Sequence, residues 1–189
     1  MEDYTLKVRI IRIWKFTSWG NPNDVRGFGM VLIDEKGDRI ECNVDRPHNI
    51  KWDKVLEEYG AFYIHNPTLG VNQASMEYAD DLTIDLISDV VQVYELETHA
   101  GPNKNTLKQT LVMEDLRGLK VFVTLWGDNV SEVVNYISTH ADISCLIMII
   151  QFGRLKFFGE RAYVNNTMAA TKLFINKDIE EIHEFKKEL

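Results

Sequence analysis

The amino-acid sequence predicts an all-β protein with short helices, made of two successive small barrels and a C-terminal helix. Three observations support this prediction. Runs rich in β-branched and aromatic residues recur along the chain, tight glycine-containing turns join some of them in pairs, and the order of strands and helices repeats. With 189 residues, 45% of them hydrophobic, the chain is long enough for two domains that each have a core.

The first unit begins with a β-type run over residues 8–16, in which β-branched residues dominate. Two shorter runs, residues 30–34 and 39–44, flank the turn EKGD. A glycine in so short a connection is typical of a β-hairpin turn, and Gly37 occupies that place. The sequence therefore predicts one long strand followed by a hairpin.

A short helix is predicted after this hairpin, over residues 52–59. Its apolar residues recur at i, i+3, i+4 and i+7, the spacing of one helix face. They are Trp52, Val55, Leu56 and Tyr59. Gly60 is expected to end the helix, and residues 61–66 and 81–87 are predicted to form two further strands.

The second unit repeats the hairpin of the first. Residues 109–114 and 120–126 flank the turn DLRG, in which Gly118 stands 81 residues after Gly37. A recurrence of this length indicates two copies of one domain type.

The rest of the second unit also repeats. A helix is predicted over residues 130–138, because apolar residues again recur at i, i+3, i+4 and i+7. They are Val130, Val133, Val134 and Ile137. The last strands are expected over residues 145–152 and within residues 161–176. Strand, hairpin, helix, hairpin is the order of the oligonucleotide-binding (OB) fold, a five-stranded Greek-key barrel, so we expect two tandem OB barrels.

The predicted domains are one barrel over residues 1–88, a second over 89–177 and a helix over 178–189. Residues 82–96 are expected to hold the last strand of the first barrel and the first strand of the second. They contain no Gly/Pro/Ser spacer, which favours a rigid junction. Residues 97–105 are expected in the first hairpin loop of the second barrel.

The C-terminal segment is predicted to be an amphipathic helix with Asp178 as a candidate N-cap. Its apolar stripe consists of Ile179, Ile182, Phe185 and Leu189. Two alternatives are open for this stripe. It mediates self-association or contact with a protein partner, or it packs back onto its own barrel.

The charge is unevenly distributed along the chain, whose net charge is −8. Residues 1–95 hold 10 Lys and Arg against 17 Asp and Glu, residues 96–177 hold 9 against 7, and the last twelve residues hold 2 against 5. Because binding to nucleic acid without sequence preference depends on neutralising phosphates, this distribution favours the second barrel as the binding domain.

Aromatic residues stand at strand ends among basic residues in the second unit. Trp126 ends one β-type run, and Phe158 ends another. Arg154, Lys156 and Arg161 flank the second of these aromatics. This combination is what a protein needs to stack unpaired bases and hold their phosphates. The alternative is that both aromatics belong to the core.

Two tryptophans of the first unit are further candidates for a binding groove. Trp14 lies in the first predicted strand, where a core position is the alternative. Trp19 lies in the segment SWGNPND and is expected in a loop that is partly open to solvent.

The sequence contains no recognisable catalytic motif, so we expect neither an enzyme nor a bound cofactor. Five scattered His and two distant Cys, Cys42 and Cys145, support neither a metal site nor a disulfide framework. No apolar run approaches the ~20 residues that span a bilayer, and the acidic N-terminus is unlike a signal peptide. The protein is expected to be intracellular and not bound to a membrane.

Several segments resemble the large subunit of replication protein A, a eukaryotic single-stranded DNA-binding protein. VTLWG (123–127), FGRLKFFGER (152–161) and LFINKDIEEIHEF (173–185) are similar to its second high-affinity OB domain. KVRIIRIWKF and VLIDEKGDRIECNV resemble the preceding OB domain, with plant-type members most similar. The zinc-ribbon OB domain that follows in that subunit has no counterpart here, so a fragment or a short paralogue is expected.

The resemblance implies a set of binding residues. Trp126 and Phe158 match the two stacking aromatics of the second domain, and Arg154 matches the basic residue before the turn. In the first domain the stacking positions correspond to Val44 and to Ala74–Ser75, which are not aromatic. The resemblance further implies a nuclear protein of DNA replication, repair, recombination or telomere maintenance.

Two functions are therefore open. In the first, the protein binds single-stranded DNA or RNA by stacking and phosphate contacts, without strong sequence preference. In the second, it is an OB-fold interaction module that docks protein partners through an acidic first barrel and the terminal helix, with weak or no binding of nucleic acid.

Overall fold

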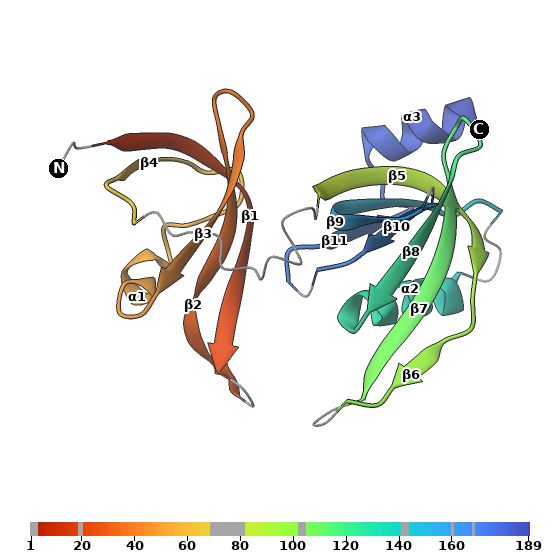
Figure 1. Ribbon diagram of the computed structural model, residues 1–189, viewed down its shortest axis with the longest axis horizontal. Coiled ribbons are helices and arrows are strands. Elements are labelled where there is room, and N and C mark those ends of the chain that lie inside the picture. The colour runs from red at the N-terminus through yellow and green to blue at the C-terminus, as the bar shows by residue number, and fades with distance from the viewer. Residues whose placement is uncertain are drawn as a thin grey trace. The chain divides into compact units, whose positions relative to one another are not determined.

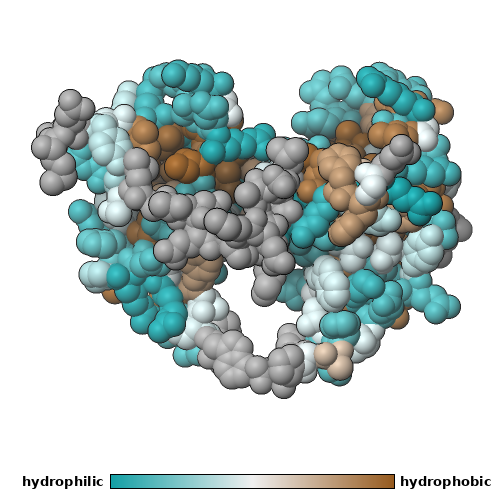
Figure 2. Space-filling model, in the orientation of Figure 1, coloured by the Kyte–Doolittle hydropathy of each residue, from teal (hydrophilic) through white to brown (hydrophobic). Residues whose placement is uncertain are grey.

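The computed structural model describes residues 4–18, 21–68, 82–101, 105–140, 144–159, 161–167 and 169–189. The chain divides into two compact units, residues 1–73 and 74–189 (Figure 1). Both units are built from β-strands with short helices between or after them, so the predicted fold class is confirmed. In Figure 2, the visible surface is mostly hydrophilic, with hydrophobic patches on both units.

The first unit is a curled antiparallel sheet of four strands in the order β3-β2-β1-β4. The strands are β1 (Thr5–Ser18), β2 (Asn21–Asp34), β3 (Arg39–Asp45) and β4 (Ala61–His65), and a short helix, α1 (Asn49–Trp52), lies between β3 and β4. This is the order of the first four strands of a Greek-key barrel. The predicted strands over 8–16, 30–34, 39–44 and 61–66 are confirmed.

The inner face of this sheet forms the core of the first unit. Val8, Ile10, Met30 and Leu32 are buried, and Val44, among others, packs against them. Successive side chains of a strand point to opposite faces of the sheet, so every second residue points inward and the others form an outer face.

The helix predicted over residues 52–59 is wrong in extent, because α1 ends at Trp52 and turns follow it. The backbone N–H of Tyr59 donates to the carbonyl of Ile10 (2.7 Å), and the N–H of Ile10 donates to the carbonyl of Gly60 (2.9 Å). Tyr59 has a φ of 68°. These hydrogen bonds to β1 hold the backbone of Tyr59 and Gly60 in a non-helical conformation, so the helix does not continue to residue 59. Of the predicted stripe, Leu56 packs on the core, whereas Val55 and Tyr59 are exposed.

The second unit is a closed five-stranded barrel. Its strands pair in the cyclic order β5-β7-β8-β10-β9 and back to β5, and β10 runs parallel to β8. They are β5 (Leu82–Val93), β7 (Thr106–Glu114), β8 (Lys120–Trp126), β9 (Ile147–Phe158) and β10 (Arg161–Asn165). Short strands β6 (Glu97–His99) and β11 (Lys172–Ile175) extend the sheet at β7 and β9.

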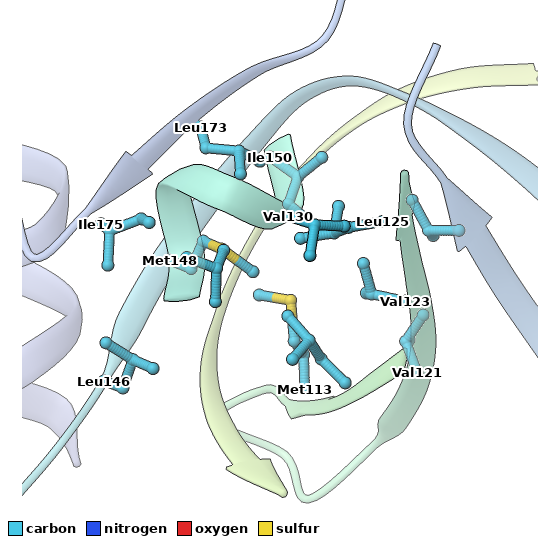
Figure 3. Packing of buried hydrophobic residues seen from close by; sticks show 13 residues of the cluster. Met113, Val121, Val123, Leu125, Val130, Leu146, Met148, Ile150, Leu173 and Ile175 are labelled. Carbon is cyan, nitrogen blue, oxygen red and sulfur yellow. The ribbon is translucent and has the colours of Figure 1, made fainter. Parts of the chain in front are cut away.

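Helix α2 (Asp128–Thr139) connects β8 to β9 and confirms the helix predicted over residues 130–138. Val130 and Val133 on this helix are buried. They pack with inward residues of the barrel strands, including Leu125, Met148 and Ile150 (Figure 3). The barrel therefore has one continuous apolar core.

Strand β9 pairs along one edge with two strands, first with β11 and then with β10. Residues 148–151 pair with β11, and residues 154–158 pair with β10. Between them Phe152 has a φ of 57°, and a Cβ on Gly153 would lie 2.6 Å from a methyl group of Val164. The bend at Phe152–Gly153 therefore needs a small residue, and it turns the second half of β9 toward β10.

Strand β5 belongs entirely to the second unit, which corrects the predicted boundary at residue 88. Residues 82–89 pair with β9 and residues 89–93 pair with β7. The carboxylate of Asp85 accepts from the backbone N–H of Phe152 (2.9 Å), and that of Asp89 accepts from Leu146 (3.1 Å). Because these bonds fix β5 on β9, residues 81–87 do not supply the last strand of the first barrel. No fifth strand lies among the described residues of the first unit.

This boundary also changes the distribution of charge. Residues 1–73 hold 10 Lys and Arg against 11 Asp and Glu, whereas residues 74–189 hold 11 against 18. The first unit is thus nearly neutral, with a net charge of −1, and the second carries −7. The expectation of an acidic first barrel was wrong, because it counted the six acidic residues of 74–95, among them Asp85 and Asp89 of β5, with the first unit.

Helix α3 (Glu180–Glu188) packs back onto its own barrel beside β5 and β9 (Figure 1). Ile182 is fully buried and Phe185 is 6% exposed; both contact a cluster around Ile147, and Ile179 packs against the same cluster. Only Leu189 of the predicted stripe is largely exposed. The stripe therefore does not offer a free interface for self-association, and the second alternative for this helix is confirmed.

Candidate nucleic-acid interface

The outer face of β8 presents aromatic and polar side chains. Val121, Val123 and Leu125 are buried inside the barrel, and the residues between them point outward. The outward residues are Lys120, Phe122, Thr124 and Trp126. Trp126 is thus placed on the outer face and not in the core, which is the arrangement that base stacking requires.

Asparagine side chains fix the position of Trp126 at the end of β8. The Asn166 Oδ1 accepts from the Trp126 backbone N–H (2.8 Å), and the Asn166 Nδ2 donates to the Trp126 carbonyl (3.2 Å) and to Oδ1 of Asn129 (2.8 Å). Gly127 then takes a φ of 63°, which ends the strand. The indole is thus held on a rigid element.

The side chains of β6 and β7 surround the Trp126 ring. His99 of β6 meets it edge-on, with the ring centroids 5.6 Å apart. The Nζ of Lys108, on β7, lies 5.9 Å from the ring centroid. Trp126 therefore has an imidazole and an ammonium group beside its ring.

The predicted basic residues lie on the same outer face, on β10, which pairs with β8, and on β9, which pairs with β10. Arg154, Lys156 and Phe158 alternate along the second half of β9. In the β9–β10 register they lie opposite Asn165, Tyr163 and Arg161, respectively. Directly opposed residues of antiparallel strands share a face, so the predicted residues are brought together on β8, β9 and β10.

Three aromatic rings form a cluster in this face. Phe122 stacks on Tyr163 with centroids 5.5 Å apart, and Phe158 meets Tyr163 edge-on at 5.4 Å. Phe158 is 67% exposed, so it is not a core residue. The sequence interpretation missed Phe122 and Tyr163. The two-residue alternation that leads from Trp126 back through Thr124 would have found Phe122.

Trp126 and Phe158 mark the two ends of this face. Phe158 is paired with Arg161 of β10, and Arg161 lies two residues before Tyr163. Tyr163 is paired with Phe122 of β8, and Phe122 lies four residues before Trp126. Six steps at about 3.3 Å per residue place the two ends about 20 Å apart. This length suits a short stretch of single strand, since one OB fold contacts roughly 4–16 nucleotides.

The first unit places its candidate residues differently. Trp14 is half-buried, and its indole ring lies over Gly29, its partner on β2. A Cβ on this glycine would lie 2.4 Å from the ring. Phe16 meets Trp14 edge-on at 6.1 Å. Val44 points inward and packs on the core. Trp19 and Ala74–Ser75 lie outside the described residues.

A metal site, a reactive cysteine and a membrane-spanning helix each place requirements on the described part of the chain. Among those residues no three His, Cys, Asp or Glu side chains are grouped as a metal site would require. Burial raises the pKa of the Cys42 thiol and, with the nearby Asp89 carboxylate, that of the Cys145 thiol. An activated cysteine has a lowered pKa, so neither thiol is poised as a nucleophile. Of the helices described, none is long and apolar enough to cross a membrane.

Comparisons with known proteins agree with the fold. Residues 1–81 match the family described as "Domain of unknown function DUF223", and the match ends just before β5. No curated protein matches the chain. A chain in the structure of a replication protein A heterotrimer bound to single-stranded DNA is 16% identical, with a TM-score of 0.53. The alignment covers 99% of this chain and 52% of that chain, so the protein spans about half its length.

Two further structures align over most of the chain with lower scores. A murine DNA-binding protein bound to double-stranded DNA is 10% identical, with a TM-score of 0.48. The alignment covers 93% of this chain and 98% of that chain. A deletion mutant of the Thermus aquaticus single-stranded DNA-binding protein is 13% identical, with coverages of 95% and 98% and a TM-score of 0.28.

Proposed function

We propose that the protein binds single-stranded DNA without strong sequence preference, through the outer face of β7, β8, β9 and β10. One observation carries this proposal: Trp126 and Phe158 end a single outer face that also holds Arg154, Lys156 and Arg161. Aromatic rings at both ends stack bases, and the basic residues of the face hold the phosphates between them. The surface of strands 2 and 3 and the loop between strands 4 and 5 are also where OB folds generally bind oligonucleotides.

The net charge of −7 on the second unit does not oppose this proposal, because many of its acidic residues lie on β5 and in the terminal segment, and Glu97 and Glu114 are paired with Lys108 and Lys120. Asp85 and Asp89 accept backbone hydrogen bonds between β5 and β9. Five more acidic residues lie in the terminal segment 178–189, whose helix α3 packs against β5 and β9 around Ile147. Phosphate contacts depend on local charge, since interactions beyond about 10 Å are largely screened at moderate ionic strength.

For the biological role we propose a non-enzymatic protein of the nucleus that is similar to the large subunit of replication protein A. It would protect or present single strands in DNA replication, repair, recombination or telomere maintenance. The sequence segments that resemble this subunit lie in both units, and the fold agrees with this proposal. Single-stranded RNA is the competing ligand, and parallel titrations with oligo-dT and oligo-U would separate the two.

The proposal is tested by titrating the full chain with fluorescently labelled oligo-dT. Trp126→Ala and Phe158→Ala should each weaken binding about tenfold or more, because stacking contributes about 1–3 kcal/mol per base. Asp45→Ala is the matched control, since Asp45 ends β3 as Trp126 ends β8. It should leave the affinity unchanged.

Circular dichroism of each variant would show that the fold is retained. If both aromatic variants bind like the wild type, the outer face is not the binding site. That result would favour the second candidate function, an interaction module. The observation in its favour is the outer edge of β3, where Glu41 and Asp45 are exposed.

A further inference from the structure

Trp126 is the last of three residues that lie in one row across three strands. Glu97 of β6 is paired with Lys108 of β7, and Lys108 is paired with Trp126 of β8. The Nζ of Lys108 lies 3.2 Å from Oε1 and 3.1 Å from Oε2 of Glu97. The same Nζ lies 5.9 Å from the centroid of the Trp126 ring. The ammonium group is therefore placed between a carboxylate and an aromatic face.

The position of Lys108 is one that a bound nucleotide would reach. A base stacked on Trp126 carries its sugar and phosphate to the edge of the indole ring, and lysine is a common partner of phosphate. In the free protein, however, the two oxygens of Glu97 already accept from this ammonium group. A carboxylate that offers two oxygens presents the same charge and the same acceptors as a phosphate edge.

The two partners differ in how far their side chains are exposed to solvent. The Lys108 side chain is 27% exposed, whereas that of Glu97 is 56% exposed. Glu97 therefore lies on the solvent side of the pair and can turn away while Lys108 stays beside the indole. His99, also on β6, keeps its edge-on contact with Trp126, so the exchange requires no movement of the stacking ring.

We propose, on the basis of the function proposed above, that Lys108 binds a backbone phosphate next to Trp126 and that Glu97 is an internal mimic of this phosphate. Binding of a strand then exchanges the carboxylate of Glu97 for a phosphate of the ligand. The carboxylate lowers the affinity in the free protein, because its ion pair with Lys108 must break first. Removing the carboxylate should therefore strengthen binding, which is the opposite sign to the loss of a stacking or basic residue.

The test measures the affinity of the full chain for fluorescein-labelled oligo-dT of roughly 12 nucleotides, a length within the range of one OB fold. Glu97→Gln should tighten binding about two- to fivefold, the range expected when an exposed ion pair no longer competes. Glu95→Gln is the matched control, because Glu95 carries the same charge and is exposed two residues away. It should tighten binding clearly less.

A double substitution separates this exchange from a general effect of charge. Lys108→Gln should weaken binding and flatten the log–log salt dependence by about 0.7. Adding Glu97→Gln to Lys108→Gln should then change the affinity no more than Glu95→Gln does. The same tightening with and without Lys108, or equal effects of Glu97→Gln and Glu95→Gln, would overturn the proposal. Thermal melting of each variant checks that the barrel is intact.

Failure of this inference can be distinguished from failure of the proposed function. If the wild type binds oligo-dT and Trp126→Ala weakens it, while Glu97→Gln behaves as Glu95→Gln, only the role of Glu97 is refuted. If the wild type binds neither oligo-dT nor oligo-U, the proposed function fails and the inference fails with it.

Discussion

The central hairpins of the two units, β2–β3 and β7–β8, follow the same register at an offset of 81 residues but present different outer faces. Gly27 pairs with Asp45 in the first unit, and Lys108 pairs with Trp126 in the second. The turns also correspond. Asp34 accepts from the backbone N–H groups two and four residues later, and Asp115 does the same. The backbone frame is thus duplicated residue by residue.

The outward side chains of the third strands differ in kind. In β3 they are Arg39, Glu41, Asn43 and Asp45, and at the same positions of β8 they are Lys120, Phe122, Thr124 and Trp126. The counterpart of Trp126 is therefore Asp45, and Val44 corresponds to the buried Leu125. The first unit is nearly neutral and the second is acidic. Aromatic content and local placement, rather than net charge, therefore distinguish the candidate binding face.

The largest expected effect concerns α3, which covers part of the outer surface of the second barrel. Ile182→Glu would bury a charge among Ile147 and Phe185, which should cost about 3–5 kcal/mol of unfolding free energy or prevent folding of the second unit. Leu189→Glu, on the same stripe but 62% exposed, should have little effect. Thermal melting measures both variants.

Light scattering on the same two variants tests the assignment of this helix to its own barrel. Neither variant should change the oligomeric state through the stripe. A dimer that Ile182→Glu converts to a monomer without loss of stability would show that the stripe is an interface instead.

The basic residues of the two outer faces are expected to differ in their effect on salt dependence. Lys156→Gln and Arg161→Gln should each flatten the log–log salt dependence of oligo-dT binding by about 0.7–1, because each removes one phosphate contact. Arg39→Gln, which lies on the outer face of the first unit, should leave this slope unchanged. Equal slopes for all three variants would mean that the basic residues of the second unit do not contact phosphates.

The smallest expected effect concerns the tryptophan of the first unit. Trp14→Ala should change the affinity for oligo-dT less than about threefold, well below the stacking contribution expected for Trp126. It should instead destabilise the first unit by roughly 1–3 kcal/mol, since the half-buried indole covers Gly29. A loss of affinity as large as that of Trp126→Ala would show that both units bind the strand.

Much of the fold could be predicted from local patterns. The alternation of apolar residues identifies β2, β3, β7 and β8, and the spacing of Gly37 and Gly118 identifies two copies of one hairpin. The helix α2 was also predictable, because its apolar stripe faces a core along its whole length. The same reasoning failed for residues 52–59, where hydrogen bonds to Ile10, distant in sequence, override the helical spacing.

The candidate site was predicted in part. Trp126, Phe158, Arg154, Lys156 and Arg161 could be selected because strand ends with aromatic and basic residues are recognisable in the sequence. Phe122 was missed although the alternation along β8 points it outward, and Tyr163 was missed because its contact with Phe122 joins two parallel strands whose register no local pattern reveals.

Most strands, the two hairpin turns and the outward alternation along β3 and β8 could be read from the sequence alone, because these depend on residues within a few positions of one another. Which segments pair with one another depends on the tertiary structure. It assigned β5 to the second barrel, folded α3 onto that barrel and set Glu97, Lys108 and Trp126 in one row. Such choices depend on hydrogen bonds and packing between residues far apart in the chain, and a strand's own periodicity carries no information about which edge it will join.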